Sequence, residues 1–330
     1  MHVAILRRLT ARVLACALPL LALFAADAQA QGRFPERPIR LVIPFAPGGE
    51  TDIFSRAVAP RLGEVLGQQI VIENRPGATG IVACEYVSRS KPDGYTLIFG
   101  TAATHALNLA VFKSLPYHPL RDFEPVAFVG NVPLVLFAHP SMPSTLMEFV
   151  ALLKANPGKY SYGAAGSSTS HLGIELLKAA AGVSAAHIPY KGTGPALQDT
   201  VAGQVQFMVA SIGVGQPMAQ AGRLKAIAVM AKQRMAAAPE VPTFAEAGLA
   251  DFEVGTWNVV MAPPGTPRPV VERLNAAINE VMRDAGIRER LIKLGITPVA
   301  DSTPAGTAET IANEIVKWAR AFELSGAKPE

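Results

Sequence analysis

Short apolar, β-branched runs alternate along this chain with longer segments of helical periodicity. This alternation is typical of strand–helix–strand units, in which parallel strands form a sheet that helices cover on both faces. We expect strands at residues 39–45, 69–73, 96–100, 126–129, 134–138, 186–188, 205–210 and 224–229. We expect helices at residues 52–66, 81–90, 146–156, 169–181, 195–202, 267–283, 288–294 and 304–322, the first kinked or broken at Pro60.

Two interruptions divide this α/β pattern into two lobes. Gly130-Asn131-Val132-Pro133 separates two apolar strands, and an extended run between Glu253 and Met261 ends at Pro263-Pro264-Gly265. If both are crossings, the first lobe comprises residues 31–130 plus 256–330, and the second comprises residues 131–255. A small ligand would bind in the cleft between the lobes, and the two crossings would form a hinge.

The first 30 residues have the pattern of a secretory signal peptide. Arginines precede an apolar run from Val13 to Ala26, and Ala28-Gln29-Ala30 follows as a small-x-small cleavage site. We therefore expect export and cleavage after Ala30. Lipid attachment at Cys16 and twin-arginine export through Arg7-Arg8 are alternatives. Cys16 lies too close to the arginines to leave an apolar region before it, and the arginine pair lacks its extended motif.

The remaining chain has a nearly balanced charge and a single cysteine. Losing three arginines and Asp27 lowers the formal net charge from +4 to +2, which does not favour nucleic acid as a partner. Cys84 alone forms neither an internal disulfide nor a cysteine zinc site, and we expect it buried in a helix. No later stretch is long and apolar enough to span a bilayer.

A glycine-rich turn between the first strand and the first helix is the sharpest local feature. Phe45-Ala46-Pro47-Gly48-Gly49 leads through Glu50 and Thr51 to Asp52. Ligands bind at the carboxyl ends of strands in such sheets, and a helix start with exposed N–H groups attracts an oxyanion. Alternatively, the glycines only turn the chain while Thr51 or Asp52 caps the helix. Asp52 suits the cap better, because a carboxylate repels an anion.

Three further stretches also follow strands. Gly166-Ser167-Ser168-Thr169-Ser170-His171 places four hydroxyls at a helix start, of which a cap explains one. Thr101, Thr104 and His105 follow another strand. Pro189-Tyr190-Lys191-Gly192-Thr193-Gly194 has Leu197 where a dinucleotide fingerprint needs glycine, so no such cofactor is expected. Lys191 is either the cation of the cleft or a solvated surface lysine.

Motifs in matching order and spacing cover essentially the whole chain after the signal peptide. They are Arg37-Pro38-Ile39, Pro47-Gly48-Gly49 with Asp52, Glu73-Asn74-Arg75-Pro76-Gly77, Pro92-Asp93-Gly94-Tyr95, Thr104-His105-Ala106, Asp122-Phe123 with Pro125-Val126, Pro189-Tyr190-Lys191-Gly192, Ala202-Gly203-Gln204-Val205, and Val241-Pro242-Thr243 with Glu246-Ala247-Gly248. In these motifs the chain closely resembles the Bug receptors, the extracytoplasmic binding proteins of tripartite tricarboxylate transporters.

The resemblance implies a periplasmic receptor rather than an enzyme. The fold would be a two-lobed, type II-like periplasmic binding protein, each lobe a mostly parallel sheet flanked by helices, with a two-strand hinge. The ligand would be a small organic carboxylate, namely a dicarboxylate, a tricarboxylate, an acidic amino acid or an aromatic acid. Backbone amides, hydroxyls and waters would hold it, without cofactor or metal. The receptor would be a monomer that transiently contacts membrane permease subunits.

The resemblance also implies a set of ligand contacts. In the first lobe they are Phe45, Ala46, Pro47, Gly48, Gly49, Thr51, Asp52, Thr101, Thr104 and His105. In the second lobe they are Gly166, Ser167, Ser168, Thr169, Ser170, His171, Tyr190, Lys191 and Ser211. Trp257 and Asn258 lie where the chain re-enters the first lobe, and Trp257 either walls an apolar part of the ligand or belongs to the core.

Two departures from the family pattern bear on the ligand. Ala210-Ser211 stands where many relatives have an acidic residue, so Ser211 offers no counter-charge to an amino group and a plain carboxylate is favoured. Glu50 stands where relatives have a small or polar residue. Facing the cleft it would penalise a highly charged anion, but unpaired glutamates are rarely buried, so we expect it to face water.

A secreted hydrolase and a sensory receptor are two alternatives to a transport receptor. A secreted hydrolase would need a G-x-S-x-G elbow, whereas Val209-Ala210-Ser211-Ile212-Gly213 lacks its first glycine and no histidine follows Ser211. His171 and Glu175 are one helical turn apart and could suggest a metal site, but no third ligand candidate lies nearby, so a surface or capping pair is expected. A sensory receptor that signals to a membrane-bound sensor kinase would use the same cleft and the same closure, so the sequence does not separate it from a transport receptor.

Overall fold

The computed structural model describes residues 34–166, 168–249, 252–324 and 329. The expected signal peptide and Ser167 lie outside these residues. Pro38–Glu330 form one compact unit.

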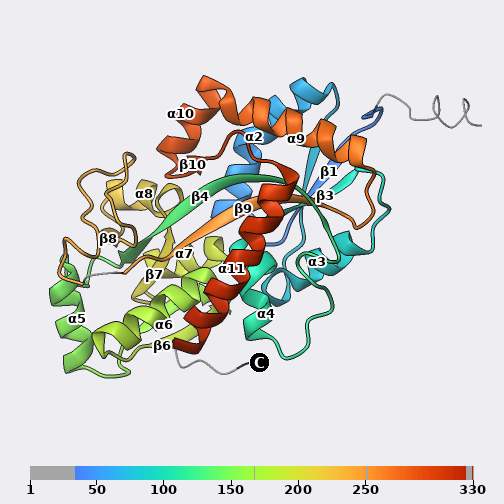
Figure 1. Ribbon diagram of the computed structural model, residues 1–330. Coiled ribbons are helices and arrows are strands. Elements are labelled where there is room, and N and C mark those ends of the chain that lie inside the picture. The colour runs from blue at the N-terminus through green and yellow to red at the C-terminus, as the bar shows by residue number, and fades with distance from the viewer. Residues whose placement is uncertain (1–33, 167, 250–251, 325–328, 330) are drawn as a thin grey trace, which may run out of the picture. The chain divides into compact units, whose positions relative to one another are not determined.

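Ten strands form one continuous sheet (Figure 1). Its main path runs in the order β2-β1-β3-β9-β4-β7-β5-β6, and both β8 and β10 pair with β4. The strands are β1 (Ile39–Ile43), β2 (Ile70–Asn74), β3 (Thr96–Thr101), β4 (Glu124–Ala138), β5 (Ser161–Ala165), β6 (Ala186–Tyr190), β7 (Phe207–Ser211), β8 (Lys225–Val229), β9 (Gly255–Ala262) and β10 (Thr297–Pro298).

The outer strands are parallel and the central ones antiparallel. At one end β1 pairs in parallel with β2 and β3, and at the other β5 pairs in parallel with β6 and β7. Between these groups β9 pairs antiparallel with β3 and β4, and β4 pairs antiparallel with β7 and β8. Each parallel group matches the expected strand–helix–strand units, and β4 joins the two groups.

The expected interruption at Gly130-Asn131-Val132-Pro133 is wrong, because β4 continues through it for 15 residues. Asn131 pairs with Trp257 on one side and with Thr297 on the other, so the strand is held from both edges. Gly130 serves close packing rather than a turn, since an added Cβ would lie 3.2 Å from the Phe54 ring. Glycine and proline therefore suggested a turn in a segment that neighbouring strands keep extended.

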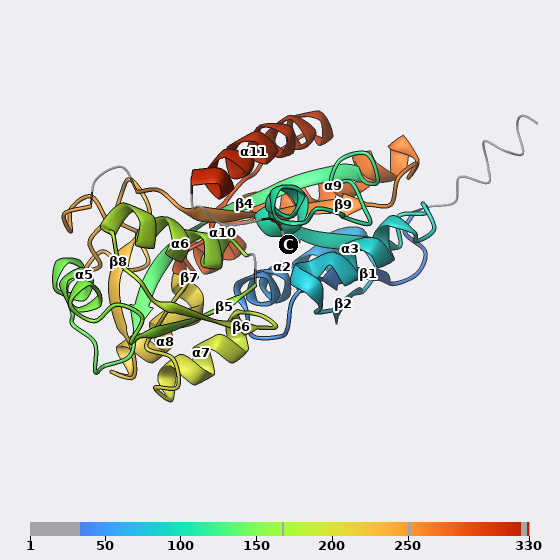
Figure 2. The same ribbon diagram turned by 90° about the horizontal axis from the view of Figure 1, so that it is seen from below.

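Helices cover both sides of the central strands. They are α2 (Glu50–Leu66), α3 (Ile81–Ser88), α4 (Asn108–Val111), α5 (Leu146–Ala155), α6 (Thr169–Ala181), α7 (Thr193–Val201), α8 (Ile212–Gln220), α9 (Arg268–Arg283), α10 (Ala285–Lys293) and α11 (Pro304–Leu324), with a 3-10 turn η1 (Ala78–Gly80) and a π-helical turn η2 (Ala103–Leu107). Figures 1 and 2 show α11 on one side of β4 and β9 and α2 on the other.

Prolines and glycines affect the prediction at two helices. Of the kink or break expected at Pro60, the break does not occur, since α2 runs from Glu50 to Leu66. Pro60 is exposed, and its missing N–H removes only the bond to the Arg56 carbonyl. Helix α8 was not expected because it contains Gly213, Gly215 and Pro217. Its glycines permit close packing: an added Cβ at Gly215 would lie 2.4 Å from the Phe137 ring.

Large apolar side chains fill the space between the sheet and its helices. Fully buried examples are Phe54, Phe99, Phe137, Phe149, Tyr162, Phe207 and Phe244. Cys84 is buried in α3, as predicted.

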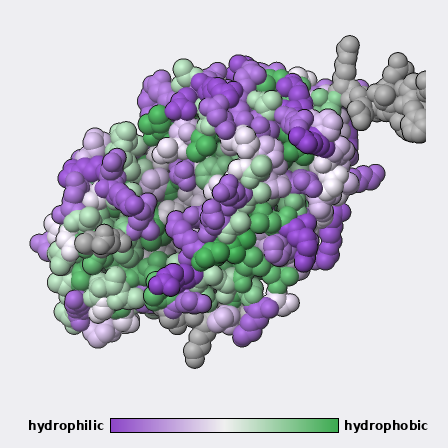
Figure 3. Space-filling view, viewed as in Figure 1, coloured by the Kyte–Doolittle hydropathy of each residue, from purple (hydrophilic) through white to green (hydrophobic). Residues whose placement is uncertain are grey.

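Figure 3 shows hydrophilic residues spread over one face with hydrophobic ones between them. None of the helices in the described ranges combines the length and apolar character needed to cross a membrane.

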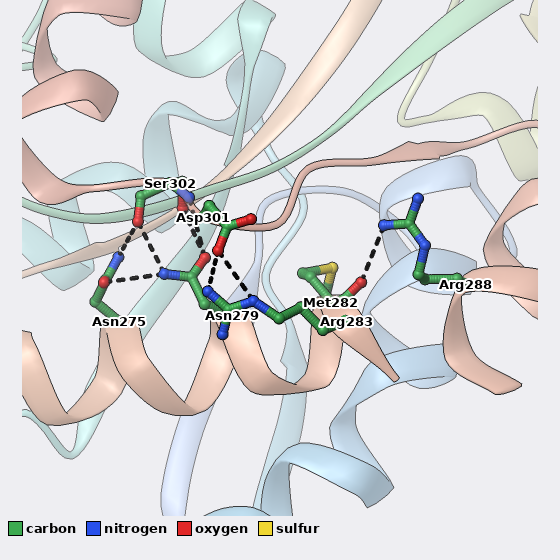
Figure 4. A network of polar contacts seen from close by, with 7 residues as sticks. All are labelled: Asn275, Asn279, Met282, Arg283, Arg288, Asp301 and Ser302. Atoms are coloured by element: carbon green, nitrogen blue, oxygen red, sulfur yellow. Dashed lines mark hydrogen bonds and ion pairs between the residues drawn. The ribbon is translucent and has the colours of Figure 1, made fainter. Parts of the chain in front are cut away.

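A polar network anchors the segment that leads into α11 (Figure 4). Asn279 of α9 donates to the Ser302 carbonyl at 2.8 Å and accepts from the Ser302 N–H at 3.1 Å. Asn275 donates to the same carbonyl and to the Val126 carbonyl of β4. Arg283 contacts Asp301 next to this network. The network therefore fixes the start of α11 relative to α9 and β4.

Candidate ligand-binding cavity

A cavity lies where the two groups of parallel strands face each other. It contains about 550 Å³ of empty space, part of it open to solvent. Its lining comes from both parts of the sheet and is made of Phe45, Gly49, Glu50, Thr51, Thr101, Ala103, Leu134, Ala165, Ser168, Thr169, Ser170, Gly192, Thr193, Ala210, Ser211 and Thr256. Most of these residues are small or carry a hydroxyl, so the cavity presents neutral hydrogen-bonding groups.

Four helices begin at this cavity. Glu50 and Thr51 open α2, Thr169 and Ser170 open α6, Thr193 opens α7, and Ser211 is the residue before α8. The first N–H groups of a helix have no partner within it, and the helix dipole places partial positive charge there. Four such ends around one space favour a negatively charged group without a cationic side chain.

The turn before α2 is held by Asp52 from behind the cavity. Asp52 Oδ2 accepts from the Gly48 N–H at 3.0 Å, and Oδ1 accepts from Arg56 Nε at 2.9 Å and Asn74 Nδ2 at 3.0 Å. Burial opposes ionisation, but these bonds outweigh it and hold the Asp52 pKa below its ordinary value. Gly48 has φ +81°, which glycine adopts without strain. Asp52, Gly48, Ala46 and Pro47 do not line the cavity.

Glu50 lines the cavity, contrary to the expectation that it faces water. Its side chain is partly exposed as a whole, but Oε1 is shielded from solvent and has no hydrogen-bond partner among the described residues. Oε2 accepts from the Thr51 hydroxyl at 3.3 Å. Burial raises the Glu50 pKa to about 7, and the Thr51 bond opposes this rise. Buried glutamates are usually paired, whereas Glu50 Oε1 is not paired with any described residue.

The turn before α6 presents hydroxyls. Ser168 caps the helix by accepting from the His171 N–H at 3.2 Å, while its own hydroxyl donates to the Ala165 carbonyl at 2.8 Å. Thr169 and Ser170 line the cavity beside it. Gly166 does not line the cavity, but its carbonyl accepts from the Thr79 hydroxyl at 2.6 Å. His171 faces away, stacking on His187 with ring centroids 4.0 Å apart.

The turn after β3 divides its residues between the cavity and the core. Thr101 lines the cavity, and its N–H donates to Thr104 Oγ1 at 2.9 Å. Thr104 and His105 are fully buried below it. His105 Nδ1 bonds the Thr104 hydroxyl at 2.8 Å, and its ring packs on Phe123. Burial lowers the His105 pKa to about 3, so the ring is neutral and belongs to the core.

The turn before α7 approaches the cavity through its glycine and threonine. Gly192 and Thr193 line it, whereas Tyr190 and Lys191 do not. The Tyr190 hydroxyl donates to Asp199 at 2.7 Å, and Lys191 is exposed. Of the two alternatives for Lys191, its position fits a solvated surface lysine rather than a cation in the cavity.

Strand β9 separates its side chains by face. Thr256 lines the cavity, and Trp257 points to the other side, where Nε1 donates to Glu314 Oε2 of α11 at 2.7 Å. Trp257 also packs on Phe128, as a core residue does. Asn258 is fully buried on the Thr256 side and opposite Thr101, and neither polar atom of its amide has a partner in the described structure. Asn258 does not line the cavity itself.

The cavity lacks a cation and a metal-binding cluster in the part of the chain that the structure describes. Glu50 is the one charged side chain among the described lining residues. The same residues contain no group of three or more His, Cys, Asp or Glu side chains placed to hold a metal ion. Neutral donors and helix starts therefore dominate the site.

Comparison with known proteins decides the family. Residues 54–326 match the family model described as the tripartite tricarboxylate transporter family receptor, TctC. The chain belongs to this receptor family. BugT of Bordetella pertussis is 38% identical over 298 residues, which cover 89% of this chain and 91% of BugT. Two solved structures are also similar, and both come from Rhodopseudomonas palustris.

MatC with bound malate is 38% identical to this receptor, with a TM-score of 0.83 over 87% of this chain and 99% of MatC. An R. palustris protein with adipate is 34% identical, with a TM-score of 0.87 over 90% and 100% of the two chains. The receptor therefore has the predicted α/β periplasmic binding protein fold. As a TctC-family receptor it is a solute-binding protein and not an enzyme, which rules out the hydrolase alternative.

The cavity gathers part of the predicted contact set. Predicted residues that line it are Phe45, Gly49, Thr51, Thr101, Ser168, Thr169, Ser170 and Ser211. Predicted residues that lie elsewhere are Ala46, Pro47, Gly48, Asp52, Thr104, His105, Gly166, His171, Tyr190, Lys191, Trp257 and Asn258. Thr193 was not predicted to line the site, although Gly192-Thr193 opens a helix through a glycine turn as Gly48-Gly49 does. Thr256 was not predicted either, because it lies within β9, which was not among the expected strands.

Proposed function

We propose that this receptor captures a small organic carboxylate in the cavity and delivers it to the membrane subunits of a tripartite tricarboxylate-type transporter. Support comes from the family, and from two relatives of this fold that are described with malate and with adipate. Ser211 in place of an acidic residue favours a plain carboxylate over an amino acid, because an amino group would find no counter-charge there.

One observation carries the proposal: four helix N-termini and several hydroxyls surround a space without a cationic side chain among its described lining residues. Micromolar binding requires about 8 kcal/mol. A hydrogen bond to a charged group contributes about 1.5–3 kcal/mol. Several aligned N–H and hydroxyl donors therefore suffice for a carboxylate, even after the free energy of closure is subtracted.

We further propose that residues 31–130 plus 256–330 and residues 131–255 are two lobes that close on the ligand. Strands β4 and β9 would form the hinge between them. The close approach of the two sides supports closure. Gly194 lies so near the Pro47 carbonyl oxygen that an added Cβ would be 2.7 Å from it. The hydrogen bond from Thr79 to Gly166 also joins the two sides. Ligand binding would stabilise these contacts.

The site of action would be the periplasm, after export and cleavage behind Ala30. Similar solved structures include the periplasmic binding protein BugD and a protein described as a periplasmic transporter. We propose that the monomeric receptor contacts the permease subunits transiently, in its closed form. N-terminal sequencing of the exported protein should begin at Gln31, and a retained Met1 would contradict cleavage.

A thermal-shift screen tests the carboxylate proposal. We expect malate, adipate, citrate or benzoate to raise the melting temperature, with a shift that grows with ligand concentration as linkage requires. Thr169→Val combined with Ser170→Ala should weaken the shift, since both hydroxyls line the cavity. Ser184→Ala, at an exposed position, is the matched control. No shift at any pH with the whole panel would refute the proposal.

A further inference from the structure

Glu50 has no role in the proposed grip on a carboxylate. It is the first residue of α2, and it lines the cavity rather than the outer surface. One of its carboxylate oxygens, Oε1, is shielded from solvent without a hydrogen-bond partner among the described residues. A shielded carboxylate oxygen without a donor is costly, so this group is expected to interact with whatever enters the cavity.

Among the described residues that line the cavity, no side chain is positively charged, so none balances Glu50. On its own helix, Asp52 is engaged by Gly48, Arg56 and Asn74. The other elements at the cavity present only uncharged described groups, which are Thr101, Ala103, Leu134, Ala165, Ser168, Thr169, Ser170, Gly192, Thr193, Ala210, Ser211 and Thr256. Titratable groups on the elements that carry these residues include the neutral buried His105, His171 beside Glu175, and the exposed Lys191.

An ionised Glu50 would oppose the binding of an anion. Two carboxylates in a space of low dielectric repel each other, and the pair is stabilised when they share one proton. Burial already places the Glu50 pKa at about 7 without a ligand. A bound anion would raise this pKa further, so the neutral acid is the form that is compatible with a carboxylate ligand.

We propose that Glu50 binds the ligand as a neutral carboxylic acid: its carboxylate takes up one proton from solvent, and the resulting O–H donates a hydrogen bond to an oxygen of the ligand carboxylate. The O–H bond of Glu50 is the one covalent bond formed in this step, and the proton stays on Glu50. The inference rests on the proposed function and makes Glu50 a specificity-determining residue. It selects anions that accept a hydrogen bond, and it disfavours them as pH rises.

The test is the pH dependence of affinity, measured by calorimetry with malate and adipate between pH 6.5 and 8.5. For the wild type, we expect the dissociation constant to rise about tenfold per pH unit above about 7, since one proton is linked to binding. Repeating the titration in two buffers of different ionisation enthalpy should show uptake of up to one proton per ligand. This proton count needs no variant.

Glu50→Gln keeps a neutral hydrogen-bond donor of the same size but does not titrate. Its affinity should be nearly independent of pH and should exceed that of the wild type at pH 8.5 by more than about tenfold. The matched control is Glu64→Gln on the same helix, where the side chain is 66% exposed, and it should keep the wild-type profile. The melting temperature of each unliganded variant checks that it folds.

Three outcomes would overturn the inference. Affinity that is independent of pH in the wild type would mean that ligand binding takes up no proton. Affinity that rises with pH and is lost in Glu50→Gln means that the ionised form of Glu50 is the one that binds, so no proton is taken up. Failure of every carboxylate to bind wild type and Glu50→Gln at all pH values overturns the proposed function as well, which separates that failure from the first two.

Discussion

The glycine-rich turn before α2 and the hydroxyl-rich turn before α6 both open a helix at the cavity but are held in different ways. The α2 turn ends at Gly49, which has no side-chain cap, and its shape depends on Asp52 with Arg56 and Asn74. The α6 turn is capped by its own Ser168, whose hydroxyl both donates and accepts. Charged side chains therefore hold the α2 turn, whereas a neutral hydroxyl caps the α6 turn.

The difference separates positioning from ligand contact. Asp52 and Arg56 do not line the cavity, so the turn before α2 is held without placing Asp52 against an anion. Glu50 brings the one charge into the described lining. The α6 side contributes hydroxyls, which can donate a hydrogen bond to an ionised ligand or accept one from a protonated ligand. We infer that the α2 side sets the charge preference of the site, while the α6 side supplies general hydrogen bonding.

Removing the charge of Asp52 should have the largest effect on stability. In Asp52→Asn, the bonds from Arg56 and the Gly48 N–H are weakened or lost, and bonds to charged groups contribute about 1.5–3 kcal/mol each. We expect the free energy of unfolding in urea to fall by about 2–4 kcal/mol. Ser168→Ala, which removes only a cap from α6, should cost about 1 kcal/mol. Equal losses in the two variants would contradict the contrast between the turns.

The same contrast has a pH signature. Because the folded pKa of Asp52 is depressed, its contribution is fully present above its unfolded pKa of about 3.9 and is lost as pH falls through the folded value. The stability difference between wild type and Asp52→Asn should therefore shrink below about pH 4. The difference between wild type and Ser168→Ala should not follow this titration.

Gly194→Ala tests whether the α2 turn must meet the α7 turn. The added Cβ would lie 2.7 Å from the Pro47 carbonyl oxygen, a backbone atom that cannot rotate away. Overpacking of this kind costs about 1–3 kcal/mol, so we expect ligand affinity to fall about tenfold or more while the open form stays folded.

The control for Gly194→Ala is Gly286→Ala, since each glycine is the second residue of a nine-residue helix. At Gly286 the nearest atom to an added Cβ is Asp284 Oδ1, at 3.4 Å. The control should keep wild-type affinity and gain a little helix stability. Unchanged affinity in Gly194→Ala would mean that the two turns need not meet for binding.

Local patterns predicted most of the fold but not the positions where tertiary contacts override them. Apolar periodicity identified α6 at its observed bounds, from Thr169 to Ala181. It missed α8, whose glycines are required by Phe137 and by the Leu294 carbonyl, groups that are distant in sequence. Because α8 was missed, the helix start behind Ser211 was not recognised as part of the anion-attracting set, although Ser211 itself was predicted.

The candidate site was predictable where one turn carries the feature, and not where side-chain direction decides. Hydroxyls at a helix start, such as Thr169, follow from sequence alone. Whether Trp257 or Thr256 faces the cavity depends on the strand alternation of β9, which was not assigned as a strand. The position of Glu50 depends on how distant segments pack around the cavity, whereas the rule that glutamates are paired or exposed predicted that it faces water.

Thr79→Val tests the smallest link between the two sides. Thr79 donates to the Gly166 carbonyl at 2.6 Å and has φ +52°. Valine has the same branched shape, so it leaves the backbone strain unchanged and removes only the hydroxyl. One hydrogen bond contributes about 0.5–1.5 kcal/mol, which predicts a severalfold loss of ligand affinity with little change in the unliganded melting temperature. Thr79→Ser should restore affinity, because it returns the donor. An equal loss in both variants would show that the methyl group, rather than the hydrogen bond to the α6 turn, stabilises closure.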